Sequence, residues 1–330
     1  MSRLALVTGA TGFVGGHVAA HLLGEGWRVR ALVRPESVAS GRLPAGCEPA
    51  VGDLLDPAAV RAAAGGVDAV FHVAARYSLA RSRAAEVART NVEGTANVLR
   101  AAREEGVPLV HTSSVATIGL PADGTPGDEE TPLDPAIVIG AYKRSKVASE
   151  RLALEAAAEG QHVVVVNPTA PVGPGDHVPT PTGRIVTDAL AGRMPAYVDT
   201  GLNLVDVRDV AAGHLLALER GRSGRRYILG NENMTLREIL HLLAALAGRR
   251  PPRVRIPHAL AVAVAAADEL VEGRIMGREP LAPLDGALMS RKRMFVDPSR
   301  AVRELGAPRS PVRDALADAI AWFRTREVAA

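Results

Sequence analysis

The sequence predicts an α/β protein in which a doubly wound parallel sheet is followed by a smaller C-terminal lobe. Short apolar runs alternate with helical segments from about residue 3 to residue 167, and a glycine-rich turn joins the first run to the first helix. After residue 167 the alternation stops, and a loop rich in proline and glycine follows. Strand, helix and strand at this spacing favour one parallel sheet with helices on both faces.

The strands of this sheet are expected at apolar runs bounded by turn signals. They are LALVT (4–8), RVRALV (28–33), DAVFHV (68–73), PLVHTS (108–113) and HVVVVN (162–167), with a further strand before VGDLLD (51–56). Helices between them include residues 14–24 and 84–105. Ligands of such sheets bind at the carboxyl ends of the strands.

The second half of the chain is expected to form the smaller lobe. Helices are predicted near residues 184–192, 236–247, 258–272 and 312–325, and residues 204–221 read as a strand and helix that return to the first domain. We therefore assign residues 1–167 and about 203–230 to the first domain, and residues 168–202 and 231–330 to a substrate-binding lobe. Substrate is expected in the cleft between them.

Composition limits the class of protein. With 47% hydrophobic and 23% charged residues the chain is globular, and a net charge of only +3 argues against a nucleic-acid binder. The single cysteine, Cys47, excludes an internal disulfide and fits a reducing, cytoplasmic location. The apolar segment 258–273 is too short to span a bilayer. The arginine clusters at 248–255 and 291–293 are either solvated or contact anionic lipid or phosphate weakly.

The glycine-rich turn "TGATGFVG" predicts a dinucleotide site. Its glycines directly follow the first strand and open the first helix, and only glycine lets backbone amides approach a pyrophosphate there. The alternative is a plain strand-to-helix turn. The expected cofactor contacts of this Rossmann-type turn are Gly9, Thr11, Gly12, Phe13, Val14 and Gly15.

The end of the second strand distinguishes NADP from NAD. An NAD site usually holds an acidic residue there, but this strand ends in Val33 followed by Arg34. A guanidinium can pair with a 2′-phosphate through two hydrogen bonds, so NADP is favoured, with NAD possible if Arg34 is simply solvated.

Other strand ends supply further cofactor contacts. Asp53 could accept from an adenine amino group while Leu54 packs on the ring, although Asp53 could equally be a turn or cap residue. After the fourth strand, small side chains let a dinucleotide lie close to the backbone. The remaining expected contacts are Val73, Ala74, Ala75 and Pro168.

Tyr142 and Lys146 predict acid–base chemistry. The chain has only three lysines, Lys143, Lys146 and Lys292, and Lys146 follows Tyr142 by four residues in a helical segment, which puts both side chains on one face. A phenol that works near pH 7 needs its pKa lowered by about 3 units, or about 4 kcal/mol. We expect the ammonium of Lys146, together with an oxidised nicotinamide, to supply much of that shift.

The fifth strand ends in "TSS", which offers the hydroxyls of Ser113 and Ser114 to a reacting carbonyl oxygen. Two serines at a strand end are ordinarily part of a turn. The tyrosine and lysine downstream favour the catalytic interpretation instead.

Together these motifs resemble those of a known family. "TGATGFVG", "GDLLD", "HVAA", "TNVEGT", "TSS" and "YKRSK" occur in the order and spacing of the extended short-chain dehydrogenase/reductases, which include sugar epimerases, dehydratases and dihydroflavonol reductases. The resemblance implies a catalytic set of Ser114, Tyr142 and Lys146, supported by Asn91. The second half, from "NPTAPVGPGDH" to "RKRMF", is similar to the hopanoid-associated sugar epimerase branch, which is linked to bacterial hopanoid lipid synthesis.

Three functions follow from the resemblance. A carbonyl reductase would act with NADPH on a sugar-like or lipid-linked ketone, a sugar epimerase would return the hydride to the same substrate, and a nucleotide sensor would do no chemistry. Epimerases of the family tend to carry an arginine where this chain has Gly201, Leu202 and Asn203, which favours the reductase. Asn167 matches the asparagine that often contacts substrate phosphate in those epimerases, which favours the epimerase instead. The intact Ser–Tyr–Lys set argues against the sensor.

Substrate contacts are expected from polar residues in segments that the family uses for substrate, each of which could equally be an ordinary surface or packing residue. They are Arg76, Tyr77, Ser114, Asn167, His177, Thr180, Arg184, Tyr197 and Asn203. His17, His21, His72 and His214 read as structural, and no spacing of His, Cys or carboxylates predicts a metal site. The family implies that the chain could form a homodimer.

Overall fold

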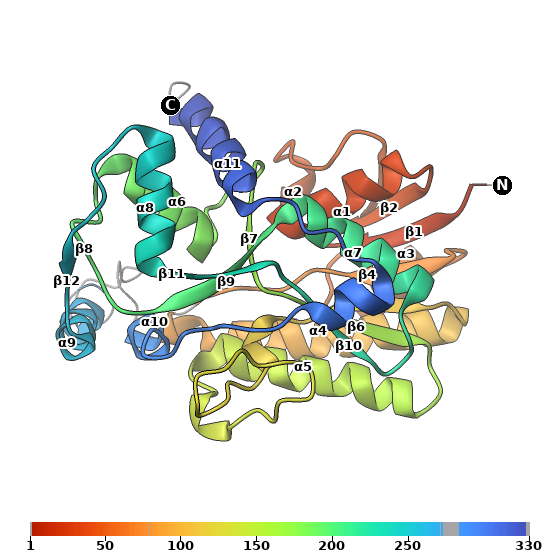
Figure 1. The fold of residues 1–330 in the computed structure, drawn as a ribbon. Helices are drawn as coiled ribbons and strands as arrows, with labels where there is room; N and C mark the ends of the chain where they lie inside the picture. Colours follow the sequence, from red (N-terminus) through yellow and green to blue (C-terminus); the bar gives the residue numbers. More distant parts are fainter. Residues whose placement is uncertain (1, 79, 271, 273–283, 328–330) are drawn as a thin grey trace.

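A seven-stranded parallel sheet forms the centre of the computed structural model (Figure 1). The structure describes residues 2–78, 80–270, 272 and 284–327. The strand order is β10–β6–β5–β4–β1–β2–β3, so the direction of winding reverses between β1 and β4. The strands are β1 (Leu4–Thr8), β2 (Arg28–Val33), β3 (Cys47–Val51), β4 (Ala69–His72), β5 (Leu109–Thr112), β6 (Val163–Pro168) and β10 (Arg226–Leu229). This arrangement confirms the predicted doubly wound fold.

Helices cover both faces of the sheet because alternate strand residues are apolar on each side. On one face α1 (Phe13–Gly24) and α7 (Val207–Arg220) pack against residues such as Val7 and Val164. On the other face Leu6 and Val165 lie under three further helices. These are α3 (Pro57–Ala64), α4 (Ala84–Glu105) and α5 (Gly140–Ala158).

The remaining elements build the second lobe around a core of its own. A three-stranded sheet of β7 (Ala170–Val172), β9 (Gly201–Asp206) and β11 (Glu232–Thr235) lies beside α6 (Pro181–Ala191), α8 (Leu236–Ala247) and α11 (Val312–Glu327). A pair of short strands, β8 (Ala196–Tyr197) and β12 (Val254–Arg255), precedes α9 (His258–Asp268) and α10 (Leu284–Met289). The short elements are α2 (Pro35–Val38), η1 (Arg81–Arg83), η2 (Val115–Thr117), η3 (Pro135–Ile137) and η5 (Ala301–Leu305).

Two expectations about the second half need correction. The strand expected to return to the first domain is β9, which pairs with β7 and β11 instead, and it is β10 that joins the edge of the main sheet. The helix expected over 258–272 ends at Asp268, and residue 271 lies outside the described residues. The exact division of the chain into two domains stays a prediction. Within the described residues, no helix is both long and apolar enough to cross a membrane.

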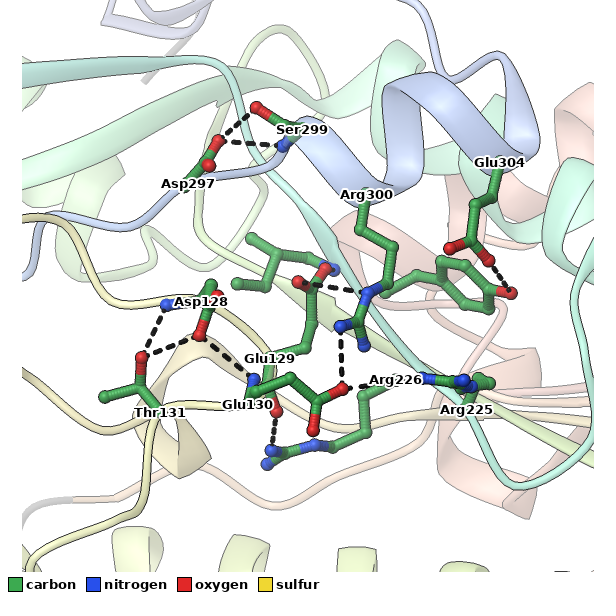
Figure 2. A network of polar contacts seen from close by, with 12 residues as sticks. Asp128, Glu129, Glu130, Thr131, Arg225, Arg226, Asp297, Ser299, Arg300 and Glu304 are labelled. Carbon is green, nitrogen blue, oxygen red and sulfur yellow. Dashed lines mark hydrogen bonds and ion pairs between the residues drawn. The ribbon is translucent and has the colours of Figure 1, made fainter.

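A polar network ties the outer edge of the main sheet to two distant segments (Figure 2). Buried Glu129 accepts a hydrogen bond from the backbone N–H of Ile228 in β10 at 2.8 Å and pairs with Arg300 at 3.6 Å. Its exposed neighbour Glu130 pairs with Arg300 at 2.7 Å. These contacts join the loop around residue 129, strand β10 and the segment before η5.

Candidate active site

The turn after β1 has the geometry that a pyrophosphate site requires. Gly9 has a φ of 77°, and a Cβ added there would lie 2.8 Å from the backbone of Ala74. A Cβ on Gly15 would lie 2.1 Å from the carbonyl oxygen of Gly9, so a larger residue cannot occupy either position without shifting the backbone. Helix α1 begins after Gly12 with no side-chain cap and no acidic residue in its first turn. Its N-terminal amides therefore fit an anionic cofactor group.

The ends of β1 and β4 are fastened together beside this turn. The Thr8 hydroxyl accepts hydrogen bonds from the backbone N–H groups of Val73 and Ala74, both at 3.1 Å, and contacts Nδ1 of His72 at 2.8 Å. This arrangement holds the segment of small residues after β4 against the glycine turn, as the expected dinucleotide contact requires.

The residues expected to contact the adenosine part of the cofactor follow strands β2 and β3. Arg34 directly follows β2 and forms an exposed ion pair with Glu36 at 3.2 Å. Asp53 is exposed, and its carboxylate accepts a hydrogen bond from the backbone N–H of Leu55 at 2.8 Å. This contact is the one expected of a turn residue, the alternative to an adenine contact. That contact leaves the second carboxylate oxygen for an adenine. Half-buried Leu54 packs on the sheet.

Tyr142 and Ser114 meet at the carboxyl edge of the sheet. Tyr142 lies in the first turn of α5, and its phenol is hydrogen-bonded to the side chain of Ser114, which follows β5. The Ser114 oxygen also accepts from the backbone N–H of Ala116 at 3.2 Å, which fixes the side chain at the start of η2. Ser113 is buried and contacts Thr117 at 3.5 Å, so Ser114 is the serine that faces the tyrosine.

Lys146 is held one helical turn beyond Tyr142. Its ammonium donates to the carbonyl oxygen of Thr112 at the end of β5, at 2.8 Å, and its side chain is buried. Burial lowers the pKa of Lys146 to about 8, although the Glu150 carboxylate, one turn further along α5, opposes this shift. The ammonium is thus partly desolvated, and its position is set by the backbone of the sheet.

The pKa of Tyr142 differs from the sequence-based expectation. Burial raises the pKa of this phenol above its ordinary value, and the hydrogen bond to Ser114 lowers it in part. The expected lowering by Lys146 therefore does not set this pKa in the protein by itself, because desolvation of the phenolate is the largest effect. The phenol is protonated at neutral pH, which is the form that a proton donor needs.

Asn91 supports the site from α4. Its side-chain oxygen accepts from the backbone N–H of Arg76 at 2.7 Å, and its amide donates to the carbonyl of Arg76 and to Ser145 on α5. Asn91 is buried, so its hydrogen bonds hold the segment after β4 and helix α5 in register.

A layer of buried polar residues lies beneath Lys146 and includes two histidines, His72 and His111. From the sequence, His72 is interpreted as structural and His111 is not identified. His72 and His111 are paired in register on β4 and β5, with ring centroids 5.4 Å apart. Burial and then Lys146 lower the pKa of His72 to about 3, and burial, His72 and Lys146 lower the pKa of His111. Within the described part of the chain neither ring nitrogen of His111 has a hydrogen-bond partner. The signal that could have found this layer is that both histidines lie at the carboxyl ends of adjacent strands, where they form the last register pair of β4 and β5.

Tyr77, one of the expected substrate residues, contacts Tyr142, and a second, Arg184, lies near Tyr77. The rings of Tyr77 and Tyr142 meet edge-on, with centroids 4.6 Å apart. Burial raises the pKa of Tyr77, nearby Tyr142 raises it further, and the Arg184 guanidinium of α6 lowers it. Arg184 is exposed, and none of the ion pairs among the described residues involves it. An aromatic ring thus lies beside the Tyr142 phenol, and one cation lies near Tyr77.

Two expected substrate residues are turned inward instead. Asn167 is fully buried, and its amide donates to Glu150 at 2.7 Å and to Thr117 at 2.9 Å. Asn203 is also buried, and its side chain bonds to Asn233 and to the backbone N–H of Asn231. Both residues are positioning residues in this structure, because their polar atoms face the interior.

The other expected substrate residues make contacts away from Tyr142 and Ser114. Arg76 pairs with Glu86 at 2.9 Å, and His177 stacks edge-on against Trp322 of α11 with ring centroids 5.2 Å apart. Thr180 caps the start of α6 by accepting from the backbone N–H of Gly183. Tyr197 lines a shallow surface depression of the second lobe beside Asp199 and His241, away from Ser114 and Tyr142.

No group of three or more His, Cys, Asp or Glu in the described parts of the chain could hold a metal ion. The residues at this edge of the sheet instead fit a nicotinamide cofactor, with the glycine cradle at one end and the tyrosine at the other.

Comparison with known proteins places this arrangement in a family. Residues 5–230 match the NAD dependent epimerase/dehydratase family, which covers the glycine turn, the catalytic helix and β10. The chain belongs to that family. Members of the family include both reductases and epimerases that use nicotinamide cofactors.

Two relatives and one solved structure are similar to this epimerase/dehydratase family member over nearly its whole length. A protein of Synechocystis named "Putative dihydroflavonol 4-reductase" is 46% identical over 98% of this chain and 95% of its own. "Sterol demethylase protein B" of Methylococcus capsulatus is 37% identical over 97% of this chain and 98% of its own. The crystal structure of gox2253 superposes with a TM-score of 0.87 at 46% identity, covering 98% of this chain and 99% of its own.

Proposed function

We propose that this protein is a carbonyl reductase that uses NADPH to reduce a ketone or aldehyde on a hydrophobic, lipid-linked or sugar-like substrate. The observation that supports this most directly is the position of the Tyr142 phenol beside Ser114 at the carboxyl edge of the sheet, one helical turn from Lys146. Reduction needs a proton donor beside the carbonyl oxygen. A phenol is protonated at neutral pH and can supply that proton.

The residues of the site divide the work of the reduction. The glycine turn after β1 would hold NADPH, which would supply the hydride that the carbonyl carbon needs. Ser114 donates a hydrogen bond to the carbonyl oxygen, and Tyr142 gives that oxygen its proton, so the product is an alcohol. Lys146 binds ribose hydroxyls and stabilises the tyrosinate that remains, because its ammonium is fixed beside β5 by the Thr112 carbonyl.

Three further observations favour reduction over epimerisation. The arginine that would grip a sugar diphosphate has no counterpart at Gly201, Leu202 or Asn203, and the Asn203 side chain is engaged inside the protein. The names of the two curated relatives refer to a flavonol reductase and to sterol demethylation, which are not sugar-nucleotide reactions. The aromatic edge of Tyr77 suits an apolar ring system beside the reacting carbonyl.

Net oxidation of NADPH separates the candidate functions. We expect the purified protein to oxidise NADPH in the presence of cyclic and lipid ketones, one cofactor for each alcohol formed. An epimerase returns the hydride to its substrate and would show no net oxidation. Denaturing the protein gives a second readout, since firmly retained NAD would favour epimerisation and a site that exchanges NADPH freely would favour reduction.

Arg34 should select the phosphorylated cofactor. Its ion pair with Glu36 is exposed at both ends and therefore weak, so the guanidinium can turn to a 2′-phosphate. Arg34→Ala is expected to raise KM for NADPH by about tenfold to a hundredfold and to leave KM for NADH nearly unchanged. Arg28→Ala is the matched control, because Arg28 is exposed at the other end of β2 and pairs with Glu48. Equal losses with both cofactors would contradict the assignment.

Lys146 should set the alkaline limit of activity. Burial lowers its pKa to about 8, so its ammonium loses the proton as the pH rises through that value. Tyr142 stays protonated in this window because its pKa is raised. We expect kcat/KM for NADPH to fall above about pH 8, and Lys146→Arg, which keeps its charge, to remove that limit at lower overall activity. A level profile up to about pH 10 in the native protein would count against this role of Lys146.

A further inference from the structure

Helix α9 exposes an unusually apolar surface at one edge of the second lobe. Between its first residue, His258, and its last, Asp268, it contains only alanine, valine and leucine, and of these only Ala265 is buried. Four of the eight large hydrophobic side chains that are exposed in the described residues lie between residues 254 and 270. They are Val254, Leu260, Val264 and Leu270, exposed by 58%, 51%, 56% and 52%. Apolar side chains gathered in this way are typical of a docking surface.

Arginines precede α9 along the same edge of the molecule (Figure 1). The segment that leads through β12 into α9 along one edge of the molecule carries exposed Arg249, Arg250 and Arg253 (Figure 1). Within the described residues none of these three forms an ion pair, whereas Arg255 pairs with Asp199. All three line one depression together with Pro251 and Pro252. Unpaired guanidinium groups on the same edge of the molecule as exposed valine and leucine complement a surface that is both anionic and apolar, which is the chemistry of an anionic phospholipid bilayer.

The apolar surface is connected to the candidate active site. At the end of α9, Glu269 pairs with Arg81 at 3.3 Å, and Arg81 also pairs with Asp285 of α10 at 3.3 Å. Arg81 lies four residues after Tyr77, whose ring touches Tyr142. Asp285 in turn packs against Gly140, the first residue of the helix that carries Tyr142. A bilayer held at α9 would therefore lie near the segments that position Tyr142.

We propose that residues 249–270 dock this protein on an anionic phospholipid membrane, so that a bilayer-resident ketone reaches the site without crossing water. The valine and leucine side chains insert at the boundary of head groups and acyl chains, and the arginines contact lipid phosphates. This inference deepens the proposed reductase function and rests on it for the identity of the substrate, while the docking surface itself rests on the exposed residues alone.

Vesicle sedimentation of the full chain tests the docking surface. We expect binding to vesicles of equimolar phosphatidylglycerol and phosphatidylcholine, at least about tenfold weaker binding to phosphatidylcholine alone, and weakening by added salt. The double variant Leu260→Ser/Val264→Ser should lose binding at least about tenfold. Arg250→Glu/Arg253→Glu should lose it by a similar factor and should no longer respond to salt.

Matched controls come from exposed residues elsewhere. Val178 is 66% exposed and the Arg151 side chain 74% exposed, so Val178→Ser and Arg151→Glu should bind vesicles like the native protein. Oxidation of NADPH with a water-soluble ketone should be unchanged in the α9 variants, which also shows that they fold. The proposal is overturned if the native chain ignores the mixed vesicles, or if the α9 variants bind as well as the controls. It is also overturned if the native chain self-associates, ignores vesicles and becomes monomeric in the Leu260/Val264 variant. Vesicle binding without turnover would instead reject the proposed reductase and leave the docking surface standing.

Discussion

Tyr142→Phe is expected to lower kcat by about 10²- to 10⁴-fold while leaving NADPH binding within about twofold of the native value. The substitution removes one hydroxyl, and with it the proton donor to the carbonyl oxygen and the partner of Ser114. The ring remains, so its edge-on contact with Tyr77 and the packing of α5 are preserved. Stopped-flow or steady-state loss of NADPH absorbance with a ketone substrate, beside fluorescence titration of NADPH, measures the two effects separately.

The chain offers a matched control for this substitution. Tyr197→Phe removes the same hydroxyl from a residue in the shallow depression of the second lobe, beside Asp199 and His241. We expect this variant to keep its activity within about twofold, because its phenol is not part of the catalytic edge. If Tyr142→Phe turned over at the native rate, the proton would come from another group and the proposed mechanism would fail. If both variants lost activity equally, the loss would reflect folding.

The sequence predicted the framework well because strong local signals punctuate it. The bounds of β1, β2, α4 and α8 agree with the apolar runs and helical periods, which end at turn residues or caps. The Thr235 side chain, for example, forms a capping box with Glu238 at the start of α8. The glycine turn was predictable for the same reason, since a positive φ and a close backbone contact leave glycine as the residue that fits.

The direction of polar side chains at strand ends was harder to predict. Val163, Val165 and Asn167 alternate onto one face of β6, the face that α5 covers, so Asn167 points toward Glu150 and away from the cleft. The alternation of side chains along β6 indicates that Asn167 points toward α5. The resemblance to asparagines that contact substrate predicted the opposite direction. The pKa of Tyr142 could not be predicted from spacing, because it depends on how deeply tertiary packing desolvates the phenol.

Residues that act through other residues left almost no local signal. Glu150 continues the row of Tyr142 and Lys146 at a spacing of four, yet only the fold shows that Asn167, Thr117 and Arg226 converge on its carboxylate. The same holds for Glu129, which is separated by nearly a hundred residues from the strand amide that it caps.

Glu129→Ala is expected to lower the free energy of unfolding by about 3 kcal/mol. The Glu129 side chain is only 2% exposed. Its removal leaves the buried N–H of Ile228 without an acceptor (Figure 2). Arg300, whose side chain is 14% exposed, also loses one anionic partner. Because Ile228 pairs in register with Asn167, the loss loosens β10 directly beside the residue that bonds to the Ser114 carbonyl. Urea unfolding followed by circular dichroism measures the change as a lower midpoint with an unchanged slope.

Two companion variants separate the contributions to this effect. Glu129→Gln keeps an acceptor for the Ile228 amide and loses only the charge, so it should cost less than Glu129→Ala. Glu130→Ala removes a neighbouring carboxylate that also pairs with Arg300 but is 66% exposed, so it should cost at most about 1 kcal/mol. Equal destabilisation by Glu130→Ala and Glu129→Ala would mean that the network acts through surface charge. It would contradict the claim that the buried Glu129 carboxylate stabilises the edge of the sheet by accepting from the Ile228 amide.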